Sequence, residues 1–456
     1  MKTVNTLMLI CAGLASVMPA QAKVAEYQLD NGLKIVVQED HRAPVVVSQV
    51  WYRVGSSYEL NGITGVSHVL EHMMFKGTKN LKPGEFSRII SANGGRENAF
   101  TSRDYTAYFQ RLEKSRLKVS FKLEADRMRN LQLSDEEFQK EVRVVMEERR
   151  LRTEDKPESS TYEQFNAIAL LASPYRTPVI GWMDDLKNLK VDDLADWYQR
   201  WYAPNNATLV VAGDVDADEV YALAKKYFGP LKPSRDLKPP KPQTEFLQRG
   251  QRRISVKMPA QLPYVLHGYP VPSLNSSTDA NEAYALEVLA GVLDGGDSAR
   301  LSRLIRDKGI VSSAGAGYTL SGRLSGLFLL EAVPSQGHTI AEAEQSLIDE
   351  VNKLKTTLVS ADELDRIKAQ VVASNVYERD SVFYQAMQIG TYETVGLGWK
   401  RLDEYVDKVQ AVTAEQVQAV ARKYLLEDKL TVAELIPQPM DKKARGKSVG
   451  GGHVKH

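Results

Sequence analysis

The sequence has almost no cysteine. Among its 456 residues the single cysteine is Cys11, which lies close to the N-terminus. A fold held together by disulfide bonds is therefore excluded, and so is a zinc site built from several cysteine thiolates. Any metal site in this chain has to use histidine and carboxylate side chains. Histidine is itself scarce, with seven in the whole chain.

An excess of one charge is also lacking, because 59 lysines and arginines face 58 aspartates and glutamates. The net charge of +1 gives the protein as a whole no attraction to nucleic acid or to an anionic membrane surface. A hydrophobic content of 43% and a charged content of 26% are ordinary for a folded protein, which argues against a largely disordered chain.

Long hydrophobic runs are missing too. The run at residues 7–15 is much shorter than the roughly 20 apolar residues that cross a bilayer. Lys2 precedes it and Ala20-Gln21-Ala22 follows it as a small-x-small cleavage site, a pattern typical of a secretory signal peptide. We therefore predict that residues 1–22 are a cleavable signal peptide, and that the protein is exported to the periplasm without stable membrane insertion. A buried N-terminal helix is the alternative.

Prolines crowd residues 230–246, which predicts a stiff, extended linker. This linker divides the chain into two long parts, residues 23–229 and residues 247–437. A tail rich in lysine and glycine follows at residues 438–456, and we expect it to be disordered.

The two long parts resemble diverged copies of one unit. Tyr202 leads into an apolar strand, and Tyr424 does the same 222 residues later. His68 and Glu287 each lie in a helical segment that ends at a glycine, and their offset is 219 residues. The second copy holds Ala290 where the first has a glutamate, so it cannot bind metal in the same way.

The most informative pattern is His68-Val-Leu-Glu71-His72, which lies within helical periodicity over residues 65–75. Residues four apart share a helix face, so both histidines can reach one ion. Glu71 lies on the same side, where a carboxylate can hold a metal-activated water. The alternative is an exposed helix with solvated histidines. The apolar residues around the motif argue against it, because they predict a buried helix, and a buried His-His-Glu cluster without a partner is costly.

A catalytic zinc ion usually takes three protein ligands and keeps one position open, so a third ligand has to come from elsewhere. The helix predicted over residues 136–152 offers Glu141, Glu147 and Glu148. Glu141 and Glu148 share a face two turns apart, whereas Glu147 points about 100° away. Helical geometry alone does not choose between Glu147 and Glu148. The cations that follow are typical of a solvated helix end, where they suit the helix dipole: Arg149, Arg150 and Arg152.

This order of ligands, followed by a distant glutamate, resembles the insulinase/pitrilysin-type zinc metallopeptidases. The chain length fits the branch that contains the mitochondrial processing peptidase beta subunit and exported bacterial relatives. In this family the third ligand lies about 75 residues beyond the second histidine, and 75 residues separate His72 from Glu148. The resemblance implies that His68, His72 and Glu148 bind one zinc ion per chain. It also implies that Glu71 is the catalytic general base and Glu141 a supporting acidic residue.

The resemblance covers nearly the whole chain beyond residue 22. It implies an α+β fold of two homologous domains, each a mixed, mainly antiparallel sheet with helices packed on one face, in a half-clamshell. Residues 23–229 would form the catalytic zinc-binding domain and residues 247–437 a homologous domain without metal. The implied activity is that of a zinc-dependent endopeptidase acting on peptides or unfolded polypeptides. A non-catalytic binding or scaffold subunit is the alternative, although such relatives normally lack one or more of the ligands that this chain keeps.

Two further features bear on the substrate. Residues 94–101 are similar to the family's edge strand, which pairs with the substrate backbone through positions such as Asn98, Ala99, Phe100 and Thr101. The family often adds an arginine and a tyrosine from the second domain, which help to hold the substrate carbonyl. Arg306 matches the arginine, but serines occupy the region of the tyrosine. We therefore expect a dimer, either a homodimer or a heterodimer with a metal-free homologous subunit that supplies the Arg/Tyr pair.

Overall fold

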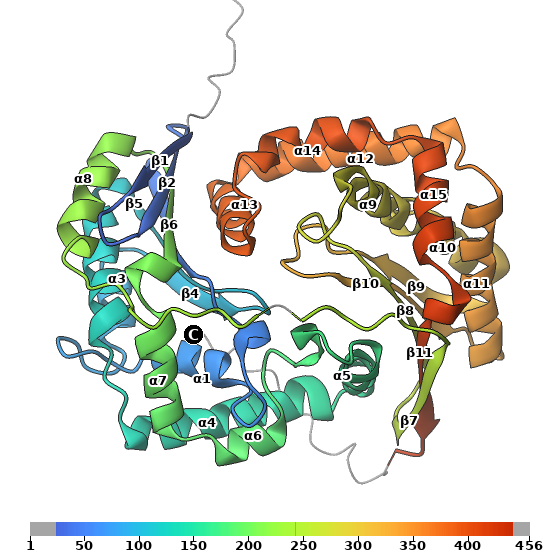
Figure 1. Cartoon of the computed structure of the whole chain (residues 1–456), viewed down its shortest axis with the longest axis horizontal. Helices are drawn as coiled ribbons and strands as arrows, with labels where there is room; N and C mark the ends of the chain where they lie inside the picture. The colour runs from blue at the N-terminus through green and yellow to red at the C-terminus, as the bar shows by residue number, and fades with distance from the viewer. Residues whose placement is uncertain (1–23, 242, 441–456) are drawn as a thin grey trace, which may run out of the picture.

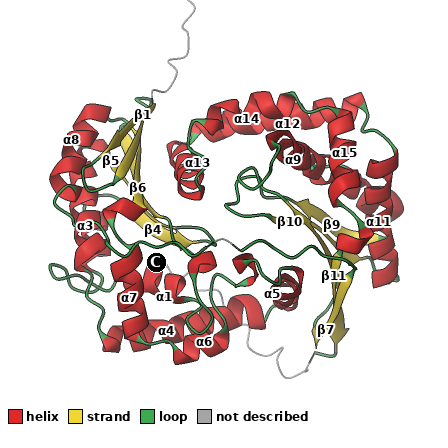
Figure 2. Ribbon diagram, viewed as in Figure 1, coloured by secondary structure: helices red, strands yellow, loops and turns green. Residues whose placement is uncertain are grey.

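The computed structural model describes residues 24–241 and 243–440. Two halves lie side by side, and each is built on one sheet (Figure 1). We call residues 24–229 the first half and residues 247–440 the second half. Helices surround the strands of both sheets (Figure 2). The predicted signal peptide and residues 441–456 of the predicted tail lie outside the described residues.

The first sheet has six strands in the order β1-β2-β6-β3-β5-β4, and only β2 and β6 run parallel. Its opening hairpin follows from the Asp-Asn-Gly turn: Gly32 takes a left-handed φ of 89°, and the Asn31 side chain accepts the N–H of Leu33 at 3.2 Å. β4 lies at the end of this order and so has a free edge among the described strands. The strands are β1 (Val24–Gln28), β2 (Lys34–Glu39), β3 (Val45–Tyr52), β4 (Arg96–Thr101), β5 (Thr106–Glu113) and β6 (Ala207–Gly213).

The helices of the first half lie mainly against one face of this sheet. α4 ends at Arg149 and continues into a π-helical turn, Arg150–Glu154. Arg149 is only 4% exposed and pairs with Glu163 at 2.7 Å, so the prediction of a solvated helix end is wrong for this arginine. The helices are α1 (Val66–Met73), α2 (Glu85–Ala92), α3 (Leu117–Asn130), α4 (Asp135–Arg149), α5 (Pro157–Ala169), α6 (Met183–Asn188), α7 (Val191–Trp201) and α8 (Ala217–Phe228).

The second sheet has five strands in the order β7-β11-β8-β10-β9. They are β7 (Arg252–Pro259), β8 (Tyr264–Val271), β9 (Val311–Gly317), β10 (Gly326–Pro334) and β11 (Thr431–Gln438). The helices of this half are α9 (Ala280–Asp294), α10 (Arg300–Arg303), α11 (Ile340–Thr356), α12 (Ala361–Asp380), α13 (Val382–Val395), α14 (Arg401–Gln410) and α15 (Ala414–Tyr424).

The two sheets share one topology. The order β2-β6-β3-β5-β4 in the first half corresponds strand for strand to β7-β11-β8-β10-β9 in the second. Each sheet has a single parallel pair, β2 with β6 and β11 with β7, and the remaining pairs are antiparallel. The predicted α+β fold with two homologous, mainly antiparallel sheets is therefore confirmed.

Each sheet also receives a helix from the other half, and Figure 1 shows both of these helices beside the sheet that they cover. α13 packs on the first sheet, where Ile389 joins Val47 and Trp51 in one buried cluster. α5 packs on the second sheet, where the ring of Phe165 lies against Gly268. Helices thus cover a second face of each sheet, beyond the single face that the resemblance implied. The exchange of helices interlocks the two halves.

No helix or strand occurs among the described residues between α8 and β7, which is the region of the predicted linker. β11 includes Gln438, the first residue of the predicted tail. Among the described helices, none combines the length and the apolar character needed to cross a membrane.

Candidate metal centre and active site

α1 carries the His-x-x-Glu-His motif, and a neighbouring carboxylate holds its first turn. Gly65 precedes α1 with a left-handed φ of 89°, and it has no side chain to cap the helix. Glu59 supplies the cap instead: its carboxylate accepts the N–H of Gly65 at 2.8 Å and the N–H of Ser67 at 2.9 Å. An acidic group at this end also complements the helix dipole. The first turn of α1 is therefore fixed just before His68.

The structure brings together the two histidines of α1 and one glutamate of α4. The Nε2 atoms of His68 and His72 lie 3.8 and 3.6 Å from Glu148 Oε2, and the ligand atoms of all three residues lie within 4.8 Å of one another. Ligand atoms around a tetrahedral zinc ion are about 3.3–3.5 Å apart for bonds near 2.0–2.1 Å. Two imidazoles and one carboxylate are also a donor set of catalytic zinc sites. The three residues therefore fit a zinc ion.

The tertiary structure distinguishes Glu147 from Glu148, the two candidates for the third ligand between which helical geometry did not choose. Glu148 is 15% exposed and faces α1. Glu147 is 59% exposed and pairs with Arg150 at 2.7 Å. Only Glu148 lies close enough to the histidines to share an ion with them.

Burial and charge separate the protonation behaviour of the two histidines. Burial, together with the nearby charge of His72, lowers the pKa of His68 to about 4. Burial would also lower the pKa of His72, but hydrogen bonds with Glu141 and Glu148 outweigh it and raise this pKa to about 9. His68 is therefore neutral near pH 7 and can act as a ligand directly, whereas metal binding at His72 has to release a proton.

Glu141 orients His72 from the side away from the cluster. Its Oε2 lies 3.3 Å from His72 Nδ1, and its Oε1 pairs with Lys76 Nζ at 2.7 Å. A carboxylate on the far ring nitrogen fixes the tautomer and the direction of a metal-binding imidazole. Nε2 of His72 is then left to face Glu148. In contrast, Nδ1 of His68 is buried without a hydrogen-bond partner among the described residues.

Glu71 lies beside the cluster and contacts the edge strand. Thr101, the last residue of β4, donates its hydroxyl to Glu71 Oε2 at 2.5 Å. Burial raises the pKa of Glu71 above its ordinary value. Asn98 turns its side chain back to the N–H of Ala99 at 2.9 Å. Phe100 packs edge-on against Trp51 on the other face of the sheet, with 5.4 Å between ring centroids.

Arg306 does not join this cluster. It lies in a π-helical turn, Leu304–Lys308, directly after α10, and α10 is on the opposite side of the molecule from α1 (Figure 1). Its guanidinium contacts Asp307 Oδ1 at 2.9 Å and the Asp297 carbonyl at 3.2 Å. A role for Arg306 in substrate binding stays a prediction.

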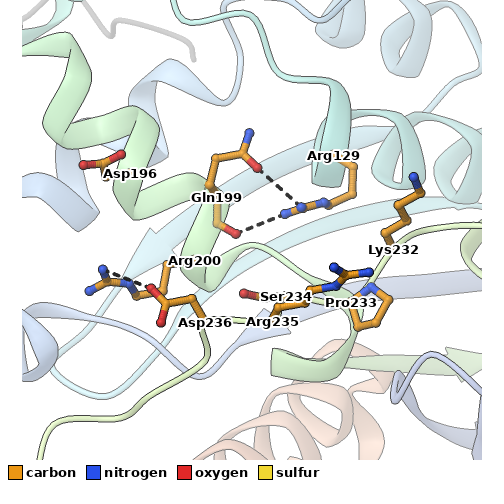
Figure 3. A pocket seen from close by; sticks show the side chains of 9 residues that line it. All are labelled: Arg129, Asp196, Gln199, Arg200, Lys232, Pro233, Ser234, Arg235 and Asp236. Atoms are coloured by element: carbon orange, nitrogen blue, oxygen red, sulfur yellow. Dashed lines mark hydrogen bonds and ion pairs between the residues drawn. The ribbon is translucent and has the colours of Figure 1, made fainter.

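Two other features lie apart from the cluster. In the second half, α9 places Glu287 near the hydroxyl of Tyr405, at 3.5 Å, and no further metal-binding group occurs in the described part of the chain. A surface pocket of about 790 Å³ lies beside α7. There Arg129 donates to Gln199 and Arg200 pairs with Asp236 (Figure 3). The residues that line this pocket do not include His68, His72 or Glu148.

Comparison with known proteins identifies the family. The family model described as "Insulinase (Peptidase family M16)" matches residues 34–181, and the "Peptidase M16 inactive domain" matches residues 188–371. The zinc protease PqqE of Helicobacter pylori is 34% identical over 374 residues, which cover 81% of this chain and 83% of that protein. The chain belongs to the insulinase family of peptidases. The predicted family is thus confirmed.

Two further matches agree with this assignment. YmxG of Bacillus subtilis, described as an uncharacterized zinc protease, is 28% identical over 89% of this chain and 96% of its own length. The crystal structure of a protease from Helicobacter pylori is 32% identical and superposes with a TM-score of 0.87, covering 91% of this chain and 100% of that chain.

The sequence did not predict two contacts within this insulinase-family site. The hydroxyl of Thr101 reaches Glu71, although the sequence indicated Thr101 only as part of a substrate strand. Glu59 caps α1 from outside the helix. Neither contact follows from helical or strand periodicity, because each joins residues of different elements.

Proposed function

We propose that the protein is a zinc-dependent endopeptidase that hydrolyses peptides or unfolded polypeptides. The convergence of His68, His72 and Glu148, with the carboxylate of Glu71 close to them, carries this proposal. When bound, a zinc ion supplies a Lewis acid that makes water acidic enough to serve as a nucleophile near neutral pH. Relatives named as zinc proteases support the same conclusion.

The residues of the chain then divide the work. Glu71 accepts the proton of the attacking water and passes it to the leaving amine. Thr101 holds one oxygen of Glu71 by its hydroxyl, so the other oxygen is left for the proton. Glu141 keeps the Nε2 atom of His72 directed at the metal.

The substrate adds to the free edge of β4. An extended peptide that pairs with residues 98–101, from Asn98 to Thr101, would use main-chain hydrogen bonds, which are available in any sequence. This strand ends at Thr101, next to Glu71, so the pairing would deliver a peptide bond to the base. Arg306 is proposed as a further substrate contact.

A non-catalytic binding or scaffold subunit of a peptidase-like complex is the rival function. A scaffold has no need of two histidines and a glutamate around one position, nor of a separate base. A protein that only stores or carries zinc has no need of Glu71. We further propose one zinc ion per chain, export by means of residues 1–22, and a dimer. In a heterodimer, a metal-free homologous subunit would supply the Arg/Tyr pair.

The test compares three glutamine variants of glutamates that lie close together. Glu71→Gln should keep zinc and lose turnover of a quenched peptide, because only the base is removed. Glu148→Gln should lose both zinc and turnover. Glu147→Gln is the matched control, since this exposed neighbour faces away, and it should keep both. Wild-type turnover in Glu71→Gln would refute the role of Glu71, and a zinc-loaded, inactive wild type would support the scaffold.

A further inference from the structure

One arginine of the second half reaches into the first half. Arg323 lies between β9 and β10, inside the region that matches the inactive-domain model. Its Nε donates to Asp104 Oδ1 at 3.0 Å and its Nη2 to Ser57 Oγ at 2.9 Å. The guanidinium also lies over the ring of Tyr58, 4.5 Å from the centroid. Both polar partners are buried.

Asp104 belongs to the turn that directly follows the proposed substrate strand. The Oγ of Ser57 donates to Asp104 at 2.9 Å, and the hydroxyl of Tyr175 donates to its other oxygen. The turn is also held through its backbone, because the N–H of Ser57 donates to the carbonyl of Arg103 at 2.8 Å. Thr101, which contacts Glu71, lies three residues before Asp104. A shift of Asp104 would therefore also move Thr101, whose hydroxyl contacts Glu71.

Ser57 connects Arg323 with α1, the helix that carries the His-x-x-Glu-His motif. It lies in the short 3₁₀ helix Ser56–Tyr58, and the next residue is Glu59, whose carboxylate caps the first turn of α1. Two N–H groups on one edge of the guanidinium, at Nε and Nη2, thus contact the segment that carries Thr101 and the segment that fixes α1. Gly55 allows these segments to touch, because a Cβ there would lie within 2.8 Å of the carbonyl oxygens of Ser102 and Arg103.

We propose that Arg323 is a positioning residue of the peptidase site, supplied by the half of the chain that has no metal cluster. The proposal rests on the proposed function. A planar guanidinium fixes both the distance and the direction between two partners, which a lysine cannot do. Its removal lets the edge strand and the motif helix shift relative to each other. A displacement of about 1 Å in a catalytic group can cost about 100-fold in rate.

The experiment compares Arg323→Met with Arg300→Met in the full-length protein. Arg300 is the matched control, because it forms a comparable two-point ion pair with Glu363, at 3.1 and 3.0 Å, within the second half only. Arg323→Met should keep zinc and KM within about threefold and lower kcat by about 10- to 100-fold. Arg323→Lys should recover part of the loss. Arg300→Met should leave kcat unchanged.

A double variant separates positioning from simple stability. Arg323→Met leaves the buried carboxylate of Asp104 without its cation, which destabilises the fold. Asp104→Asn combined with Arg323→Met removes both charges, so it folds even where the single variant does not. If the two residues act as one unit, the double variant should lose no more kcat than either single variant. Fully additive losses would overturn the proposal.

Amide hydrogen exchange of the metal-free protein gives a readout besides activity. Arg323→Met should raise exchange at residues 55–59 and 101–105, and Arg300→Met should not. Unchanged exchange there, or a kcat equal to that of Arg300→Met, would overturn the proposal. An inactive zinc-loaded wild type would contradict the proposed function instead, and the exchange comparison would still decide whether Arg323 holds the two segments.

Discussion

The contact between α13 and the first sheet gives a direct test of how the two halves are joined. Gly390 of α13 lies against the indole of Trp51, which is fully buried and donates Nε1–H to Gln49 at 2.8 Å. A Cβ at position 390 would lie within 2.5 Å of three atoms of this ring. Carbon atoms in contact normally stay about 3.5–4.0 Å apart. The nearest ring atom would lie only 2.0 Å from that Cβ, so Gly390→Ala forces the helix or the ring to move by about 1.5 Å.

Two opposing effects set the size of the change. In an exposed helix, replacing glycine by alanine stabilises by about 1 kcal/mol. Overpacking a close-packed core costs about 1–3 kcal/mol. We take the upper end of the overpacking cost, because neither partner can move easily. Gln49 holds the ring of Trp51, and Gly390 has helical residues of α13 on both sides of it. The expected net effect is a loss of about 2 kcal/mol in the free energy of unfolding.

Urea unfolding of the metal-free protein measures this loss. Gly317→Ala is the control, since a Cβ there meets nothing within 4 Å, and it should leave the midpoint nearly unchanged. In a Trp51→Leu background the clash is absent, so Gly390→Ala should become neutral or stabilising. A higher urea midpoint for Gly390→Ala in the wild-type background would refute the reasoning, because helix propensity alone would then explain the result.

Three further outcomes follow from buried charges and from the metal cluster. Burial raises the pKa of Glu287 to about 7. Below pH 4.5 this carboxyl is protonated in both the folded and the unfolded state, so it does not destabilise the fold there. Measured by urea unfolding, the free energy of unfolding of Glu287→Gln should exceed that of the wild type by an amount that grows as the pH rises from 4.5 to 7 and is constant above pH 7. For Glu344, burial alone would raise the pKa, but His267 and Arg253 outweigh it and lower the pKa to about 2. Its stabilising contribution is complete above pH 4.5 and should disappear as the pH falls towards 2; acid unfolding of Glu344→Gln should lack that component. Saturating zinc at about 1,000 times its Kd should stabilise the wild type by about 4 kcal/mol, and calorimetry should show no such response in Glu148→Gln.

Local patterns in the sequence predicted the parts of the site that lie within one element. The spacing of His68 and His72 predicted that both histidines face one side of a helix, because helical periodicity is a local property. The turn of the opening hairpin is likewise a local feature, because Gly32 takes the left-handed φ that this turn requires. The repeat of 219 to 222 residues indicated two copies of one fold, and the shared strand order bears this out.

Contacts between elements could not be predicted from such patterns. Glu147 and Glu148 are adjacent glutamates, and only the packing of α4 on α1 selects Glu148. The burial of Arg149 is a similar case, because its partner Glu163 lies on α5.

The amino-acid sequence by itself determined which residues can bind a metal, since it contains no cysteine beyond Cys11 and places two histidines four residues apart. The tertiary structure decided which carboxylate joins them, which hydroxyl contacts Glu71 and which helix covers which sheet. The reason is physical: the spacing of ligands along a helix is a property of a short segment, whereas each of these choices depends on the packing of segments that are far apart in the chain.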